Sequence, residues 1–183
     1  MFSRLIAILL FIILIPVFLI VSIIIVLYDG FPIIFKQRRI GKNNNYFYLY
    51  KFRTMKRDCP EIATHLMSNP EKYIIKFGNF FRKYSLDEIP QLFNIVKSDM
   101  HFIGPRPALH NQIDLKELRT KNNIHLIKPG LTGWAQVNGR DNISIIEKVD
   151  FEKFYIKNHS IFLDLKIIFL TLFKVVSRKG VSH

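Results

Sequence analysis

An apolar run occupies residues 5–27 and restricts the architectures open to this chain, because only Pro16 and Ser22 interrupt it. A helix needs about 20 apolar residues to reach across the hydrocarbon of a bilayer, so the run is long enough to do so. A secretory signal peptide has a shorter apolar core followed by a small-residue cleavage site, and no such site follows here. We therefore expect the run to be retained and the protein to be bound to a membrane.

Pro16 lies near the middle of this run and predicts a kink in its helix. A proline inside a helix removes one backbone hydrogen bond, and its ring clashes with the preceding turn. In lipid the freed carbonyl needs another partner, and the Ser22 hydroxyl is too far along the chain to supply one. Two arrangements remain open: a bent helix that crosses the bilayer, or a re-entrant helix that turns near Pro16 and returns to the face it entered.

The formal net charge is +13, from 27 lysine and arginine residues against 14 aspartate and glutamate residues. Attraction to an anionic membrane surface and binding of anionic ligands such as nucleotides both account for this charge, and we favour both over nucleic-acid binding. Several basic residues flank the apolar run, most of them on its C-terminal side: Arg4, Lys36, Arg38, Arg39 and Lys42. The positive-inside tendency places that side in the cytoplasm. The single cysteine, Cys59, agrees with a reducing compartment because it forms no internal disulfide.

The remainder of the chain has the pattern of a predominantly helical α/β domain with one β-hairpin. Residues 33–35 and 46–52 are predicted strands, and the intervening residues 41–45 include three asparagines and a glycine, which tolerate positive φ. The residue pattern predicts helices over 74–82, 111–122, 143–158 and 161–178, and a loop over 56–72. The last helix is apolar except for one narrow stripe. It suits either a buried core helix or a helix lying in the membrane interface, and we favour the interface.

Residues 85–107 contain the strongest chemical signal, beginning with the adjacent carboxylates Asp87 and Glu88. Asp87 as the N-cap of a helix places Pro90 in the first turn, where a missing N–H is harmless. A capping box between Ser85 and Glu88 would place Pro90 too deep in the helix, so we prefer Asp87 as the cap. At a helix start the Asp87 carboxylate would lie close to any bound anion.

Four cations with no obvious structural role accompany this pair: Lys51, Arg53, Arg82 and Arg106. A carboxylate near a diphosphate can bind Mg²⁺, act as a base, or attack phosphorus, and the residue types alone leave these three roles open. Arg106 lies between Pro105 and Pro107, so its loop is stiff and presents a guanidinium suited to bidentate phosphate recognition. The competing interpretation pairs Arg106 with a local carboxylate such as Asp99.

A glycine-rich turn over residues 128–134 is a candidate phosphate-binding turn, although its spacing differs from that of a P-loop. Its candidate nucleotide-binding residues, with the next turn, are Lys128, Gly130, Gly133 and Arg140. Trp134 and the phenylalanines are interpreted as core or interface residues. The histidines show no metal-ligand spacing.

Together these segments resemble the small monotopic phosphoglycosyl transferases, the bacterial sugar transferase family that starts glycan assembly on polyprenol phosphate. The resemblance covers nearly the whole chain. It rests on several long motifs in one order, namely residues 37–41, residues 50–55, Arg82, residues 85–107, residues 128–140 and residues 164–167. Two departures lie at the membrane segment: Ile15 precedes Pro16 where the family has serine, and only Ser3 and Arg4 stand where a basic pair and an aspartate are usual.

The resemblance implies a re-entrant membrane helix over residues 1–29 and a cytoplasmic catalytic domain with interfacial amphipathic helices over residues 30–183. It implies transfer of a sugar 1-phosphate from a UDP-sugar to undecaprenyl phosphate, with release of UMP and a requirement for Mg²⁺. Asp87 would be the nucleophile, and Glu88 would assist metal binding or the polyprenol phosphate step. Lys51, Arg82 and Arg106 match positions that surround the diphosphate.

The same resemblance places the protein at the cytoplasmic face of the bacterial inner membrane, in contact with lipid and with downstream glycosyltransferases as candidate partners. Nucleic acid is not expected as a partner. The alternative from another functional class is a catalytically inactive membrane-tethered scaffold of a glycan assembly complex. The intact Asp87–Glu88 pair and the loop over residues 104–107 favour the enzyme.

Overall fold

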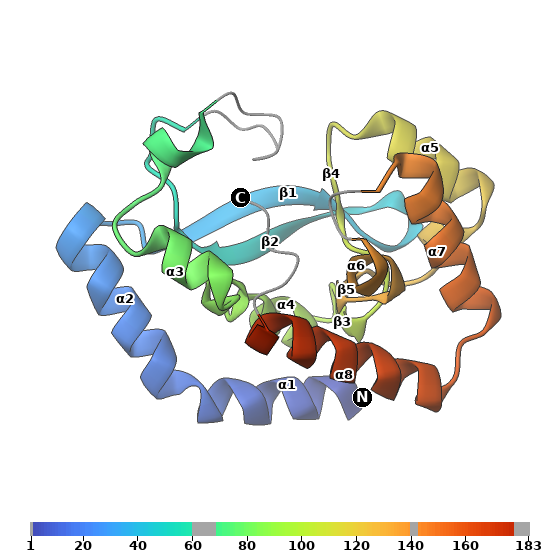
Figure 1. Cartoon of the computed structure of the whole chain (residues 1–183), viewed down its shortest axis with the longest axis horizontal. Coiled ribbons are helices and arrows are strands. Elements are labelled where there is room, and N and C mark those ends of the chain that lie inside the picture. The colour runs from blue at the N-terminus through green and yellow to red at the C-terminus, as the bar shows by residue number, and fades with distance from the viewer. Residues whose placement is uncertain (1, 60–68, 140–142, 178–183) are drawn as a thin grey trace.

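A computed structural model describes residues 2–59, 69–139 and 143–177 and shows a mostly helical chain with a small sheet, as predicted (Figure 1). The α-helices are α1 (Phe2–Ile13), α2 (Ile15–Asp29), α3 (Gly78–Lys83), α4 (Gln91–Val96), α5 (Ile113–Lys121), α6 (Trp134–Asn138), α7 (Ile145–Lys157) and α8 (Ile161–Ser177). The strands are β1 (Ile34–Ile40), β2 (Tyr46–Phe52), β3 (His101–Ile103), β4 (Ala108–Leu109) and β5 (Gly130–Thr132). Short 3₁₀ turns are η1 (Lys42–Asn44), η3 (Pro70–Tyr73), η4 (Leu86–Glu88) and η5 (Ile124–Leu126).

The apolar N-terminal segment is a bent pair of helices, which confirms the predicted kink. α1 and α2 meet at Leu14 with a 60° bend, and Pro16 lies in the first turn of α2, where its missing N–H leaves no helical bond unmade. The Ser22 hydroxyl donates to the Phe18 carbonyl within α2 (2.7 Å). No single helix in the described ranges is both long and apolar enough to cross a membrane, whereas the bent pair together meets that test by length and composition.

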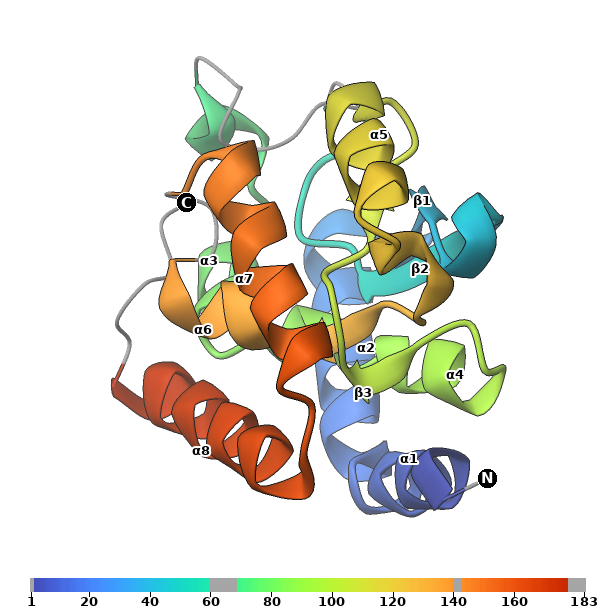
Figure 2. The ribbon, with the colours of Figure 1, turned by 90° about the vertical axis from the view of Figure 1, so that its right-hand side faces the viewer.

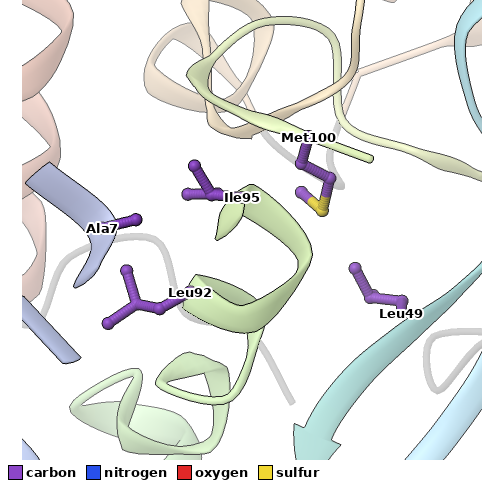
Figure 3. Packing of buried hydrophobic residues seen from close by; sticks show 5 residues of the cluster. All are labelled: Ala7, Leu49, Leu92, Ile95 and Met100. Carbon is purple, nitrogen blue, oxygen red and sulfur yellow. The ribbon is translucent and has the colours of Figure 1, made fainter. Parts of the chain in front are cut away.

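One side of each N-terminal helix packs against the rest of the molecule. Ala7 of α1 lies in a cluster with Leu92 and Ile95 of α4, Leu49 of β2, and Met100 (Figure 3). A second cluster is formed by buried residues of α2, β2, α3 and the segment before α3: Val21, Ile25, Phe52, Ile75 and Phe81. Each large side chain buried in this way contributes about 1.5–3 kcal/mol to folding, so the pair is anchored through these contacts.

The predicted hairpin is confirmed, although its first strand is longer than expected. β1 pairs antiparallel with β2 from Ile34↔Phe52 to Ile40↔Tyr46, and β4 extends the sheet in the order β2-β1-β4. Asn43 and Asn44 have φ of 56° and 59°, the left-handed conformation that asparagine tolerates better than most residues. A separate parallel pair joins β3 to β5, so part of the segment expected to be a glycine-rich turn is a strand.

The predicted helices are present with bounds that differ by up to four residues, and the largest difference is at α3. A helix from residue 74 was expected, but Ile74 is extended and bridges to Met55, and Phe77 has a left-handed backbone (φ 68°). The helix therefore begins at Gly78.

At α7 a capping box explains the boundary, because Ser144 Oγ accepts from the Glu147 N–H (3.2 Å) while the Ser144 N–H donates to Glu147 Oε2 (2.8 Å). Much of the expected loop lies outside the described residues, at 60–68.

α8 exposes most of its apolar side chains, which contradicts the buried-core alternative. Phe162 is 79% exposed and Phe169 67%, whereas Ile167 is buried against Val137 and Tyr155. The Tyr155 hydroxyl donates to Asp164 Oδ1 (2.9 Å), joining α7 to α8, and burial of the phenol raises the pKa of Tyr155. α8 and α1 lie along the same edge of the molecule, at the bottom of Figures 1 and 2.

Candidate active site

Asp87 and Glu88 lie in the short turn η4 between α3 and α4, so the prediction that Asp87 caps a helix is wrong. Pro90 occupies the N-cap position of α4, which begins at Gln91. Ser85 adopts a left-handed backbone (φ 55°) that turns the chain sharply after α3. The Asp87 side chain is consequently directed inward from a turn, and the residue is only 7% exposed.

Lys51 of β2 is the cation shared by both carboxylates. Its Nζ lies 2.7 Å from Glu88 Oε1 and 3.4 Å from Asp87 Oδ2. The neighbouring strand backbone is fixed by Asn94 of α4, which is fully buried: its amide donates to the Tyr48 carbonyl (2.7 Å) and accepts from the Tyr50 N–H (3.1 Å). The Asn94 amide thus forms one donor and one acceptor hydrogen bond with the backbone of β2, as a neighbouring strand would. These bonds fix the strand next to Lys51 and so hold Lys51 beside η4.

Arg106 approaches the same carboxylate from the loop between β3 and β4. Its Nη2 lies 3.1 Å from Glu88 Oε1, the oxygen that also accepts from Lys51. Asp99, the competing partner, instead faces Lys97 at 3.7 Å and accepts from Asn94 at 3.2 Å. The structure therefore brings Arg106 to the carboxylate pair and favours the interpretation that groups these residues in one site.

Arg82 lies on α3 with its Nε donating to the Thr54 hydroxyl (2.9 Å). Burial lowers the pKa of Arg82, and the Asp87 carboxylate acts in the opposite direction. An arginine remains protonated in proteins, so this group supplies a fixed positive charge beside Asp87. Lys51, Arg82 and Arg106 thus surround the carboxylates from three different elements of the fold.

Arg53 was included among the cations without a structural role, and the structure corrects that view. Its guanidinium forms an ion pair with Asp29 (2.7 Å) and donates to the carbonyls of Asp29 (2.9 Å) and Gly30 (2.6 Å). These groups lie at the C-terminal end of α2, where helix carbonyls lack intrahelical partners. Arg53, the residue that follows β2, therefore fastens the N-terminal helix pair to the end of that strand.

The glycine-rich segment packs against the loop that precedes Arg106. A side chain at Gly130 would collide with the backbone nitrogen of Gly104, and one at Gly133 would collide with the Gly104 carbonyl. This close approach by itself requires glycine at both positions. The presence of the two glycines is therefore explained without a bound phosphate. Lys128 lines a cavity that adjoins the carboxylate site, and Arg140 lies outside the described residues.

A cavity of about 1110 Å³ adjoins the carboxylate site and extends between α1 and α8. Ser85, Glu88 and Arg106 contribute to its wall. Apolar side chains of the two helices, together with Leu14 at the break between α1 and α2, form much of the remainder; those of the helices include Ile6, Leu10, Leu165, Ile168 and Leu172. One concave surface thus combines a charged cluster with an extended apolar lining.

Asp87 and Glu88 fit the ligands that a protein supplies to a magnesium site. In the part of the chain that the structure describes, no group of three or more His, Cys, Asp or Glu residues could hold a metal ion. Mg²⁺ commonly takes only one or two protein carboxylates and completes its six oxygen ligands with water and substrate phosphate. Asp87 and Glu88 provide hard oxygen ligands of this kind, next to cations suited to the phosphates.

Arg119 and Glu152 are buried polar residues that sequence reasoning missed. Both were assigned to helices, but their pairing joins α5 to α7 across 33 residues, and no local pattern indicates such a contact. Arg119 Nε donates to Glu152 Oε2 (2.8 Å), and its Nη2 donates to the Arg106 carbonyl (2.9 Å). The pair therefore reaches the backbone of a site residue.

The family model described as bacterial sugar transferase matches residues 1–178. The uncharacterized sugar transferase EpsL of Bacillus subtilis is 43% identical over 154 residues, covering 84% of this chain and 75% of that protein. The exopolysaccharide production protein ExoY of Sinorhizobium fredii is 36% identical over 194 residues, covering 98% and 85%. UDP-glucose:undecaprenyl-phosphate glucose-1-phosphate transferase of Escherichia coli is 39% identical over 151 residues, covering 78% of this chain but 32% of the relative.

Proposed function

Because this chain belongs to the bacterial sugar transferase family, we propose that it transfers a sugar 1-phosphate from a UDP-sugar to undecaprenyl phosphate, giving undecaprenyl-diphosphate-sugar and UMP. Two relatives, from Xanthomonas campestris and Escherichia coli, are named for a UDP-sugar donor and undecaprenyl phosphate, and a third, from Salmonella typhimurium, is named for undecaprenyl phosphate and galactose. The observation that carries the proposal is the cluster of Asp87, Glu88, Lys51 and Arg106, of which Glu88 and Arg106 line a largely apolar cavity. The charged cluster suits the diphosphate of a UDP-sugar. The apolar lining suits the isoprenoid chain of the acceptor.

In the first step an Asp87 carboxylate oxygen attacks the phosphorus attached to the sugar. A new oxygen–phosphorus bond forms, and the bond from that phosphorus to the bridging oxygen breaks, so that UMP leaves with the bridging oxygen and its electron pair. The result is an aspartyl-phosphosugar, a mixed anhydride of the enzyme. The burial of Asp87 excludes water from one side of this anhydride, which protects it until the acceptor arrives.

In the second step a phosphate oxygen of undecaprenyl phosphate attacks the same phosphorus. The bond between phosphorus and the Asp87 oxygen breaks, which restores the carboxylate and releases the diphosphate-linked product. Glu88 lies next to Asp87 and is held by Lys51 and Arg106, so it is placed to assist the incoming phosphate.

Fixed cations reduce the barrier of both steps because negative charge accumulates on the transferring group. Lys51 and Arg106 face the carboxylates from β2 and from the proline-flanked loop, and Arg82 adds a charge from α3. Asp87 and Glu88 are the residues that would hold Mg²⁺, which when bound neutralises charge on the diphosphate.

Release of UMP is the measurement that tests this function. Purified protein in detergent, supplied with Mg²⁺, undecaprenyl phosphate and a panel of UDP-sugars, should release UMP with at least one sugar and form the matching lipid-linked product. A chelator should stop the reaction. Absence of turnover across the panel, with UDP-sugar binding retained, would favour the inactive scaffold instead.

The apolar wall of the cavity is proposed to hold the first isoprene units of the acceptor. Ile168 lines the cavity, whereas its neighbour Phe169 is 67% exposed and is not part of the lining. Ile168→Glu should raise the KM for undecaprenyl phosphate about tenfold or more, because an unpaired carboxylate against hydrocarbon is unfavourable by at least ~1.4 kcal/mol. Release of UMP in the absence of acceptor should be unchanged.

Phe169→Glu is the matched control, since it places the same charge one residue along α8. It should leave the KM for undecaprenyl phosphate in detergent near that of the unmodified protein. Equal KM values for both variants would show that the cavity does not hold the acceptor.

The bent helix pair is proposed to be re-entrant, with the rest of the chain at the cytoplasmic surface of the bacterial inner membrane. This arrangement leaves α8, α1 and the cavity at one surface, where undecaprenyl phosphate can enter from the same leaflet. In a chain with Cys59 replaced, single cysteines at positions 2 and 36 should both resist a membrane-impermeant thiol reagent applied to intact bacterial cells. Both should react once the cytoplasmic face is opened.

Position 36 serves as the internal control because Lys36 lies on the exposed side of β1. Labelling of the position 2 cysteine in intact cells, with position 36 still protected, would show instead that the pair crosses the bilayer.

A further inference from the structure

The loop that presents Arg106 is held by three consecutive backbone carbonyls. The Pro105 carbonyl accepts from the Gly130 N–H, the Arg106 carbonyl from Arg119 Nη2, and the Pro107 carbonyl from Arg39 Nη1, each at 2.9 Å. The two prolines have no N–H to donate, so the loop is fastened largely through these acceptors. The three donors come from β5, α5 and β1, three different parts of the fold.

The donor to the Arg106 carbonyl is itself fixed by a buried carboxylate. Arg119 Nε lies 2.8 Å from Glu152 Oε2, and Nη2 lies 2.5 Å from Glu152 Oε1. Arg119 is 7% exposed and Glu152 2%. The two parallel bonds set the plane of the guanidinium, and they direct the remaining hydrogen of Nη2 at the Arg106 carbonyl.

Stability alone does not account for this pair. Removing two charges from water is unfavourable, and well-packed apolar side chains of the same size often stabilise a fold as well or better. Arg119 also bonds to a backbone carbonyl outside the pair, an arrangement that two apolar residues would not provide. The contact reaches the one residue of the loop whose side chain points to Glu88.

We propose that Arg119 and Glu152 are positioning residues that set the place of the Arg106 guanidinium for the diphosphate of the donor. This inference rests on the proposed function, in which Arg106 contacts that diphosphate. Neither Arg119 nor Glu152 touches the reacting atoms. They act through the Arg106 backbone, and their effect on the reaction therefore requires the Arg106 side chain.

A double-mutant cycle tests this dependence. Arg119→Lys keeps the charge beside Glu152, but one ammonium does not reproduce the paired bonds and the carbonyl bond together. We expect kcat/KM for the UDP-sugar to fall about tenfold in the otherwise unmodified protein, since a displacement near 1 Å suffices for such a loss. In an Arg106→Ala background the same change should lower kcat/KM less than twofold.

Arg53→Lys is the matched control because Arg53 is also a buried arginine with one carboxylate partner and backbone carbonyl contacts, but at the end of α2. Its effect on kcat/KM should be the same fold-change with and without the Arg106 side chain. The melting temperature of each variant shows that folded proteins are being compared.

Equal losses of kcat/KM from Arg119→Lys in both backgrounds would overturn the inference. The Arg119–Glu152 pair would then serve only to join α5 to α7. If Arg119→Lys does not fold, Glu152→Gln takes its place. It keeps an acceptor for Arg119 while removing the charge, and the same comparison across the two backgrounds decides the question. Absence of turnover by the unmodified protein would overturn the proposed function, and this inference with it. Turnover with independent losses would overturn the inference alone.

Discussion

Asp87→Asn is expected to abolish both the release of UMP without acceptor and the complete reaction, by at least about a thousandfold. The amide oxygen is a poor nucleophile and carries no negative charge for phosphorus or for Mg²⁺. The side chain keeps its size, and Lys51 keeps its 2.7 Å contact with Glu88, so the fold should persist. The unmodified protein should release UMP without acceptor in an amount comparable to enzyme.

Mass measurement of the intact protein tests the proposed covalent step directly. Incubation with UDP-sugar and Mg²⁺ in the absence of acceptor should add the mass of one sugar phosphate, and Asp87→Asn should show no addition. Asp114→Asn, the same chemical change at an exposed position of α5, is the control and should behave as the unmodified protein. Turnover by Asp87→Asn near the normal rate would rule out Asp87 as the nucleophile.

The local features of the fold could be predicted because each depends on a few neighbouring residues. Pro16 predicts the bend between α1 and α2, and the asparagines at positions 43 and 44 predict the turn of the hairpin. The residue types of the site were also predictable, since Lys51, Asp87, Glu88 and Arg106 are suited to a diphosphate and a metal. The structure brings these four together.

The errors came where distant contacts override a local preference. Asp87 was expected to cap a helix because aspartate favours that position, but the left-handed Ser85 places it in a separate turn. The structural role of Arg53 was not predictable from the sequence because its carbonyl partners at the end of α2 lie 23 and 24 residues earlier. Gly130 and Gly133 stay candidate nucleotide-binding residues, but their contact with Gly104 was not predictable from the sequence because it depends on the pairing of β3 with β5.

Arg106→Lys is expected to lower kcat/KM for the UDP-sugar about ten- to a hundredfold while the fold is retained. The backbone of residues 105–107 is already held through one carbonyl bond at each residue, so the loop cannot readily shift to accommodate a different side chain at position 106. A guanidinium at this place can contact Glu88 through one nitrogen and direct others at phosphate oxygens. A lysine ammonium has a single nitrogen. It would therefore lose either the contact with Glu88 or a contact with the phosphate oxygens.

The measurement should use UDP-sugar below its KM, where a loss of phosphate recognition has its full effect on rate. Arg38→Lys is the control, since Arg38 lies on β1 with its guanidinium over the Tyr46 ring (4.0 Å), and its replacement should leave turnover nearly unchanged. Because the charge at position 106 is conserved, a large loss would have to come from the shape of the guanidinium. Normal activity of Arg106→Lys under these conditions would instead make Arg106 an ion-pair partner of Glu88 alone, with Lys51 and Arg82 left to bind the diphosphate.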